Sequence, residues 1–113
     1  MKLNLILTNR KELGSGEIVT YIPKPIDTSK IYLNKDLEGL VDYLARNIHE
    51  NWAAVRIQQG WRYGLERNDT KKEHPCLVPF ERLPESEKDH DRYIAKELIK
   101  TILLLGYQIE KEA

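Results

Sequence analysis

The sequence predicts a mainly α-helical domain: two long antiparallel helices joined by an irregular crossover and preceded by an extended N-terminal arm. Two stretches in which apolar residues recur every three or four positions predict the helices. The segment between them lacks such a period and is rich in turn-forming residues. A chain of 113 residues has room for one hydrophobic core.

The first helix is expected from about Lys35 to about Gln59. Asn34 can cap its start through its side chain, and Gly60 can adopt the left-handed conformation that closes a helix. Its expected buried stripe is Leu37, Leu40, Val41, Leu44, Ala45, Ile48, Trp52 and Val55.

The second helix is expected from Pro84 to about Leu105, with Gly106 ending it. Its expected buried stripe is Ile94, Ala95, Leu98, Ile102 and Leu105. Extended backwards, this stripe reaches Glu87 and Asp91, whose buried carboxylates would need partners. The arginines available are Arg56, Arg62 and Arg92.

The remaining segments set the expected domain limits. Residues 61–84 should cross the surface irregularly, and a loop of that length favours a functional role. Residues 1–20 alternate weakly at Leu3, Leu5 and Leu7 and break at 14–16, which indicates an edge strand or extended arm. We therefore expect an arm over 1–20, a domain over 21–109 and a tail over 110–113.

Composition argues against several classes of protein. Lys plus Arg and Asp plus Glu both number 18, so no overall field attracts nucleic acid or a membrane surface. A single cysteine, Cys76, fits a reducing compartment. No stretch reaches the length of a signal peptide core or of a membrane-spanning helix. The expected location is cytoplasmic.

No motif for catalysis, metal binding or cofactor binding is apparent. His49-Glu50-Asn51-Trp52-Ala53 begins like the zinc-protease motif but lacks its second histidine. Cys76 lies two residues from His74, but a lone cysteine is more often a small core residue than a nucleophile. We therefore expect no enzyme activity, no metal and no cofactor.

One cluster of residue types fits ligand binding. Trp52 and Arg56 are one helical turn apart, and Trp61, Arg62 and Tyr63 follow the helix end. Aromatic rings can stack a base while guanidinium groups bind phosphate. Trp52 also continues the apolar stripe, and a tryptophan in a short chain is more often part of the core. The spacing by itself favours that second interpretation.

The chain resembles the RyR domain, the repeat found in pairs in ryanodine-receptor calcium channels and singly in bacterial and phage proteins. The resemblance rests on sequence blocks that occur in order over residues 21–109. These blocks are YIPKPIDTS (21–29), LARNIHENWA (44–53), RIQQGWRYG (56–64), HPCLVPF (74–80), LPESEK (83–88), DR (91–92) and LLLGY (103–107).

The resemblance implies a mainly helical domain that binds a nucleotide or nucleotide-derived molecule. Trp52 would stack the base and Arg56 would meet phosphate, supported by Trp61, Arg62 and Tyr63. Arg92 could either balance Glu87 or face the ligand. A homodimer would mimic the paired repeats of the receptors. The alternative to ligand binding is a protein-interaction or self-dimerisation domain in which the same aromatics contact a partner chain.

Overall fold

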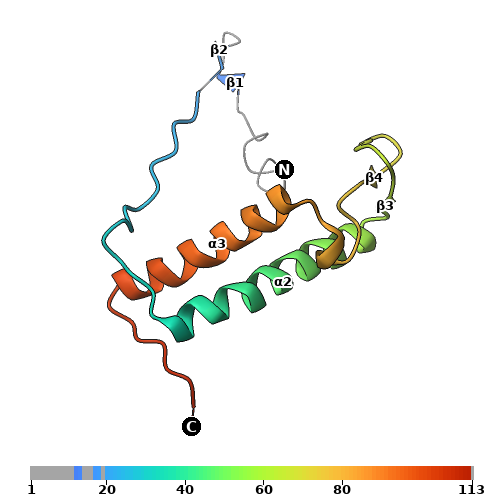
Figure 1. Cartoon of the computed structure of the whole chain (residues 1–113). Coiled ribbons are helices and arrows are strands. Elements are labelled where there is room, and N and C mark those ends of the chain that lie inside the picture. Colours follow the sequence, from blue (N-terminus) through green and yellow to red (C-terminus); the bar gives the residue numbers. More distant parts are fainter. Residues whose placement is uncertain (1–11, 14–16, 19, 113) are drawn as a thin grey trace.

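The fold consists of two long helices packed side by side, as Figure 1 shows. The computed structural model describes residues 12–13, 17–18 and 20–112. Helix α2 spans Lys35–Gln58 and helix α3 spans Glu85–Leu104. In Figure 1 the chain leaves α2 at one end of the pair, crosses over, and returns along α3. The predicted mainly α class and its two long helices are confirmed.

Both helices begin and end close to where the sequence indicated. The side-chain oxygen of Asn34 accepts a hydrogen bond from the backbone N–H of Leu37 at 2.9 Å, which caps α2. Gly60 follows α2 with φ +92°, and Gly106 follows α3 with φ +93°. Helix α3 starts after Pro84, and its first turn carries Glu85 and Glu87. Acidic residues there interact favourably with the helix dipole.

The crossover contains more regular structure than the sequence predicted. Strand β3 (Arg62–Tyr63) pairs in parallel with β4 (Glu73–His74), and a 3-10 turn, η1 (Phe80–Arg82), leads into α3. Apart from these short elements the crossover is irregular, as the sequence predicted. Strands of two residues are too short to show the alternation by which a strand is recognised in a sequence.

The main core cluster forms where the crossover meets α2. Its buried members are Ala45, Cys76, Phe80 and Leu83, with Trp52 and Val78 packed against it. Farther along, Ala95 and Ile99 of α3 are also fully buried. Alanines at 45 and 95 keep the facing surfaces of the two helices small, which allows close approach.

The predicted stripes were wrong at their edges. Val55 is 51% exposed, Leu98 52% and Leu105 63%, although all three were expected to be buried. Instead Ile99 is only 1% exposed and His49 is completely buried. A pair of helices covers a narrower face of each than a larger bundle would, so residues at the margin of each stripe stay accessible.

The N-terminal segment reaches α2 as an extended chain (Figure 1). Strands β1 (Glu12–Leu13) and β2 (Glu17–Ile18) form a short antiparallel pair on either side of the predicted break. The alternation at Leu3, Leu5 and Leu7 lies outside the described residues. Thr28 is buried, and its hydroxyl lies 2.8 Å from one carboxylate oxygen of Glu97 in α3, which ties this segment to the helices.

Candidate functional site

The ring of Trp52 lies between two histidines. Its centroid is 5.8 Å from that of His49, in a stacked arrangement, and 5.0 Å from that of His74, which meets it edge-on. The same side chain packs against the core cluster and is partly buried. Trp52 therefore contributes to the core, as one of the two interpretations of the sequence anticipated.

The guanidinium group of Arg56 lies over the ring of Trp61. Its guanidinium carbon is 5.1 Å from the centre of the Trp61 ring, a cation–π distance. One terminal nitrogen, Nη1, donates to Oε1 of Gln59 at 3.3 Å. Within the described part of the chain, no ion pair joins Arg56 to a carboxylate. The cation is thus positioned by a ring and an amide, and its charge is not neutralised by an ion pair.

The end of α2 places Trp61 against that guanidinium. The Gly60 N–H donates to the carbonyl of Ile57 at 3.0 Å, and the Trp61 N–H donates to the carbonyl of Arg56 at 3.0 Å. These bonds turn the chain back across the last helical carbonyls, a conformation that the positive φ of Gly60 permits. Lys72 adds a bond from Nζ to the carbonyl of Gln59 at 2.9 Å.

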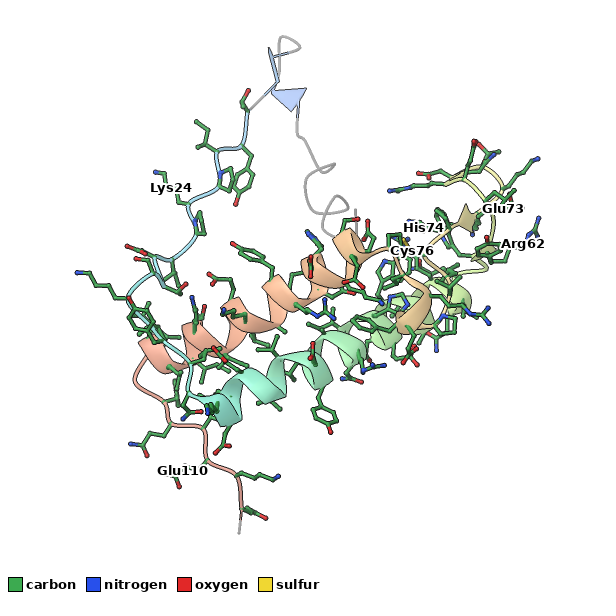
Figure 2. The ribbon with its side chains drawn as sticks, in the orientation of Figure 1. Lys24, Arg62, Glu73, His74, Cys76 and Glu110 are labelled. Atoms are coloured by element: carbon green, nitrogen blue, oxygen red, sulfur yellow. The ribbon has the colours of Figure 1, made fainter. Side chains whose placement is uncertain are left out.

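Pairing of β3 with β4 fixes the residues after Trp61. Arg62 lies opposite Glu73 and Tyr63 lies opposite His74. The Arg62 guanidinium forms an ion pair with the Glu73 carboxylate at 3.3 Å while its side chain remains 70% exposed. Tyr63 is 52% exposed. Figure 2 shows Arg62, Glu73 and His74 gathered at this end of the helix pair.

We call Arg56, Trp61, Arg62 and Tyr63 the Trp61 surface. Its members come from the last turn of α2 and from the residues that follow it. The sequence grouped these four because they are close along the chain. It did not identify His74, whose ring centroid is 6.2 Å from that of Trp61 and which links this surface to Trp52. No local spacing could signal that contact.

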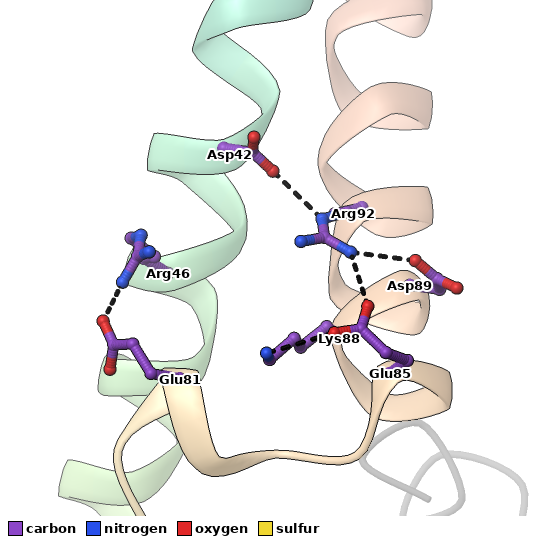
Figure 3. A network of polar contacts seen from close by, with 7 residues as sticks. All are labelled: Asp42, Arg46, Glu81, Glu85, Lys88, Asp89 and Arg92. Carbon is purple, nitrogen blue, oxygen red and sulfur yellow. Dashed lines mark hydrogen bonds and ion pairs between the residues drawn. The ribbon is translucent and has the colours of Figure 1, made fainter.

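Arg92 belongs to a different group of contacts, shown in Figure 3. Its guanidinium bonds to the carboxylates of Asp42 at 3.0 Å, Asp89 at 2.9 Å and Glu85 at 3.5 Å. The hydrogen bond to Asp42, followed by that to Asp89, raises the pKa of Arg92 above its usual range. Glu87 is not among the carboxylates that pair with Arg92 in the described part of the chain. Arg92 joins α3 to α2 through Asp42 instead.

The ring of Phe80 lies at the centre of the same group. Its centroid is 5.1 Å from the Arg46 guanidinium and 6.0 Å from both Lys88 and Arg92. Arg46 also pairs with Glu81 (Figure 3). Three cations and their carboxylate partners thus surround a buried ring where α2, η1 and α3 meet, an arrangement suited to holding these elements together.

Two hollows in the surface lie away from the Trp61 surface. One, of about 950 Å³, is formed by the start of α2 with the segment after α3, and includes Leu37, Leu40, Tyr43 and Ile109. The other, of about 380 Å³, lies beside Arg92. Neither is lined by Trp52 or by a member of the Trp61 surface. Of the six residues that the sequence singled out, Arg92 alone lines one of these two hollows.

The model of the RyR domain family matches residues 21–111, which is most of the chain. The chain belongs to the RyR domain family. The resemblance inferred from the sequence blocks is thereby confirmed, and the match includes both helices, the crossover and all six predicted site residues. Within the described part of this RyR domain, no helix is long and apolar enough to cross a bilayer.

Proposed function

We propose that this RyR domain is a non-enzymatic binding module whose ligand is a nucleotide or a nucleotide-derived anion, held at the Trp61 surface. The observation that carries the proposal is the placement of Arg56 over the Trp61 ring at 5.1 Å, with no ion pair to a described carboxylate. A fixed guanidinium can bind a phosphate group through two parallel hydrogen bonds.

The neighbouring side chains supply the rest of such a site. Tyr63 offers an exposed ring on which a base can stack, and Arg62 offers a second, largely exposed cation. Trp52 enters the proposal indirectly, because it contacts His74, which in turn contacts Trp61. Arg92 is left out of this surface because its partners are Phe80 and three carboxylates.

Calorimetric titration tests the proposal. Wild-type protein is titrated with ATP, AMP and a cyclic dinucleotide, and the titrations are repeated with Arg56→Ala. Loss of a charge-assisted contact should weaken binding about tenfold or more. Arg82→Ala is the matched control, because Arg82 is an exposed arginine in η1, outside the Trp61 surface. Absence of heat with all three nucleotides, from folded protein, would refute the proposal.

A second candidate function is self-association, favoured by an apolar flank shared by both helices. Leu44 lies two residues after Asp42, and Ile94 lies two residues after Arg92, the two members of an ion pair between the helices. Two residues correspond to about 200° around a helix. Leu44 and Ile94 therefore lie on the flank opposite that ion pair. Residues four and eleven positions farther along continue each row on the same flank. They are Ile48 and Val55 in α2, Leu98 in α3, and Leu105 directly after α3.

A second copy of the chain could cover this flank through a two-fold interface. Leu98→Glu would then shift the molecular mass measured by light scattering from dimer to monomer. Leu65→Glu is the control, because Leu65 is 86% exposed in the crossover, away from the two apolar rows. A wild-type protein that remains monomeric at millimolar concentration would argue against this second function.

A further inference from the structure

Two cations at the end of α2 are held by the same residue. Nη1 of Arg56 donates to Oε1 of Gln59 at 3.3 Å, and Nζ of Lys72 donates to the carbonyl oxygen of Gln59 at 2.9 Å. Over residues 12–13, 17–18 and 20–112, neither cation forms an ion pair with a carboxylate. Two positive charges are therefore brought together beside Trp61, and the residue that holds both is uncharged.

Lys72 reaches this place because the backbone of the crossover is fixed around it. It directly precedes β4, which Figure 1 shows with β3 at the end of α2. The Arg62 N–H donates to the carbonyl of Lys72 at 2.9 Å. The backbones of Asn68 and Glu73 exchange two hydrogen bonds of 2.9 Å. A Cβ atom at Gly60 would lie 3.9 Å from both Cδ and Nζ of Lys72, so the lysine side chain runs directly beside that residue.

Lys72 has a backbone conformation that lysine rarely adopts. Its φ is +55°, in the left-handed region, where an L side chain lies too close to its own backbone. Glycine or asparagine would form the same turn at lower cost, so the turn by itself does not require a lysine. Strained residues of this kind occur often at functional sites. A cation near a helix C-terminus also stabilises the helix, so a purely structural role for Lys72 is the alternative that the experiment must exclude.

The carboxylates nearest these cations are paired with other arginines. That of Glu73 lies 3.3 Å from the Arg62 guanidinium, and that of Asp69 lies 2.9 Å from the Arg67 guanidinium. The hydrogen bond from Arg67 is the largest cause of the lowered pKa of Asp69, and the charge of Arg56 contributes less. Asp69 therefore attracts Arg56 at longer range without occupying its N–H donors.

We propose that Arg56 and Lys72 act together to bind two linked phosphate groups, so that the ligand of the Trp61 surface contains a diphosphate. The inference rests on the proposed nucleotide-binding function and adds the class of nucleotide, a nucleoside diphosphate or a molecule that contains one. One phosphate group takes two parallel hydrogen bonds from the guanidinium of Arg56. The second meets the ammonium of Lys72, which has N–H donors left after its bond to Gln59. A monophosphate would engage only one of the two cations.

Titration calorimetry at low ionic strength tests the inference by comparing ADP with AMP, and inorganic pyrophosphate with inorganic phosphate. Wild-type protein should bind ADP about tenfold more tightly than AMP, because one more charge-assisted contact forms. Pyrophosphate should be preferred over phosphate by a similar factor. Lys72→Gln removes the charge but keeps a donor for the carbonyl of Gln59. It should abolish both preferences and leave AMP binding within about threefold of wild type.

Lys71→Gln is the matched control. Lys71 is the preceding residue and is also exposed, and its side chain forms no ion pair with a described carboxylate. The variant removes the same charge one position away, so the general attraction of anions falls equally in both variants. Lys71→Gln should keep the wild-type preference for ADP. Both side chains are exposed, and circular dichroism checks that both variants are folded.

Where nucleotides bind, the comparison of ADP with AMP decides the inference. Equal affinity of wild type for the two would overturn it and leave the nucleotide proposal intact. An unchanged preference in Lys72→Gln, or the same loss in Lys71→Gln, would also overturn it. An equal weakening of AMP and ADP in Lys72→Gln would assign Lys72 a structural role instead.

If no nucleotide binds, the proposed function fails and the inorganic anions decide the inference. A preference for pyrophosphate over phosphate that Lys72→Gln removes and Lys71→Gln retains would support the cation pair. The absence of such a preference in wild type would refute it. Failure of the nucleotide proposal and failure of the diphosphate inference therefore give different results.

Discussion

Replacing Trp52 by alanine should lower the free energy of unfolding of the domain, and its effect should not be limited to weaker ligand binding. A buried aromatic side chain removes about 200 Å² from water, which corresponds to about 5 kcal/mol at 25 cal/mol per Å². Trp52 is only partly buried, and the unfolded chain already covers some of this area, so about 3 kcal/mol is the expected loss. The substitution removes the indole ring that packs against His49, His74 and the core cluster.

Urea denaturation followed by circular dichroism measures this change in the free energy of unfolding. Tyr63→Ala is the matched control: its ring is 52% exposed, so its removal should cost less than about 0.5 kcal/mol. A loss below about 1 kcal/mol for Trp52→Ala would refute the assignment of Trp52 to the core. If the larger loss is observed, weak ligand binding by this variant says nothing about a stacking role.

The other predictions concern helix ends and the ion pair between the helices. Asn34→Ala should lower the free energy of unfolding by about 1 kcal/mol, because the Leu37 N–H loses its acceptor; urea denaturation measures it. Gly60→Ala should cost about 1 kcal/mol by the same assay, since φ there is +92°. A double-mutant cycle on Asp42 and Arg92 should give a small favourable coupling that falls further in 1 M NaCl, because the pair is accessible to solvent. A coupling unchanged by salt would contradict that reasoning.

The helices could be predicted because their signals are local. Apolar spacing, the cap at Asn34 and the glycine at 60 each act within a few residues, and each helix bound falls within about one residue of the expectation. The burial of Asp91 was also expected, from the phase of the second stripe. The margins of each buried stripe were not predicted correctly. Leu98 and Ile99 are adjacent in the sequence, and the position of the neighbouring helix decides which of the two is buried.

The candidate site was predictable only where its members are neighbours along the chain. Arg56 and Trp61 are five residues apart, and their contact follows from how α2 ends. Arg92 could not be placed, because its bond to Asp42 spans 50 positions. His74 went unrecognised for the same reason: its contacts with Trp52 and Trp61 depend on how the crossover folds back.

The bond between Thr28 and Glu97 spans 69 positions, nearly the whole distance from the start of the RyR domain match to the end of α3. It sets a practical limit for protein engineering. Any shortened version that begins after Thr28 discards a buried hydroxyl and leaves the Glu97 carboxylate without that donor. Versions that begin at residue 21 retain it, and they are the ones suited to expression as a minimal domain or to fusion with another protein.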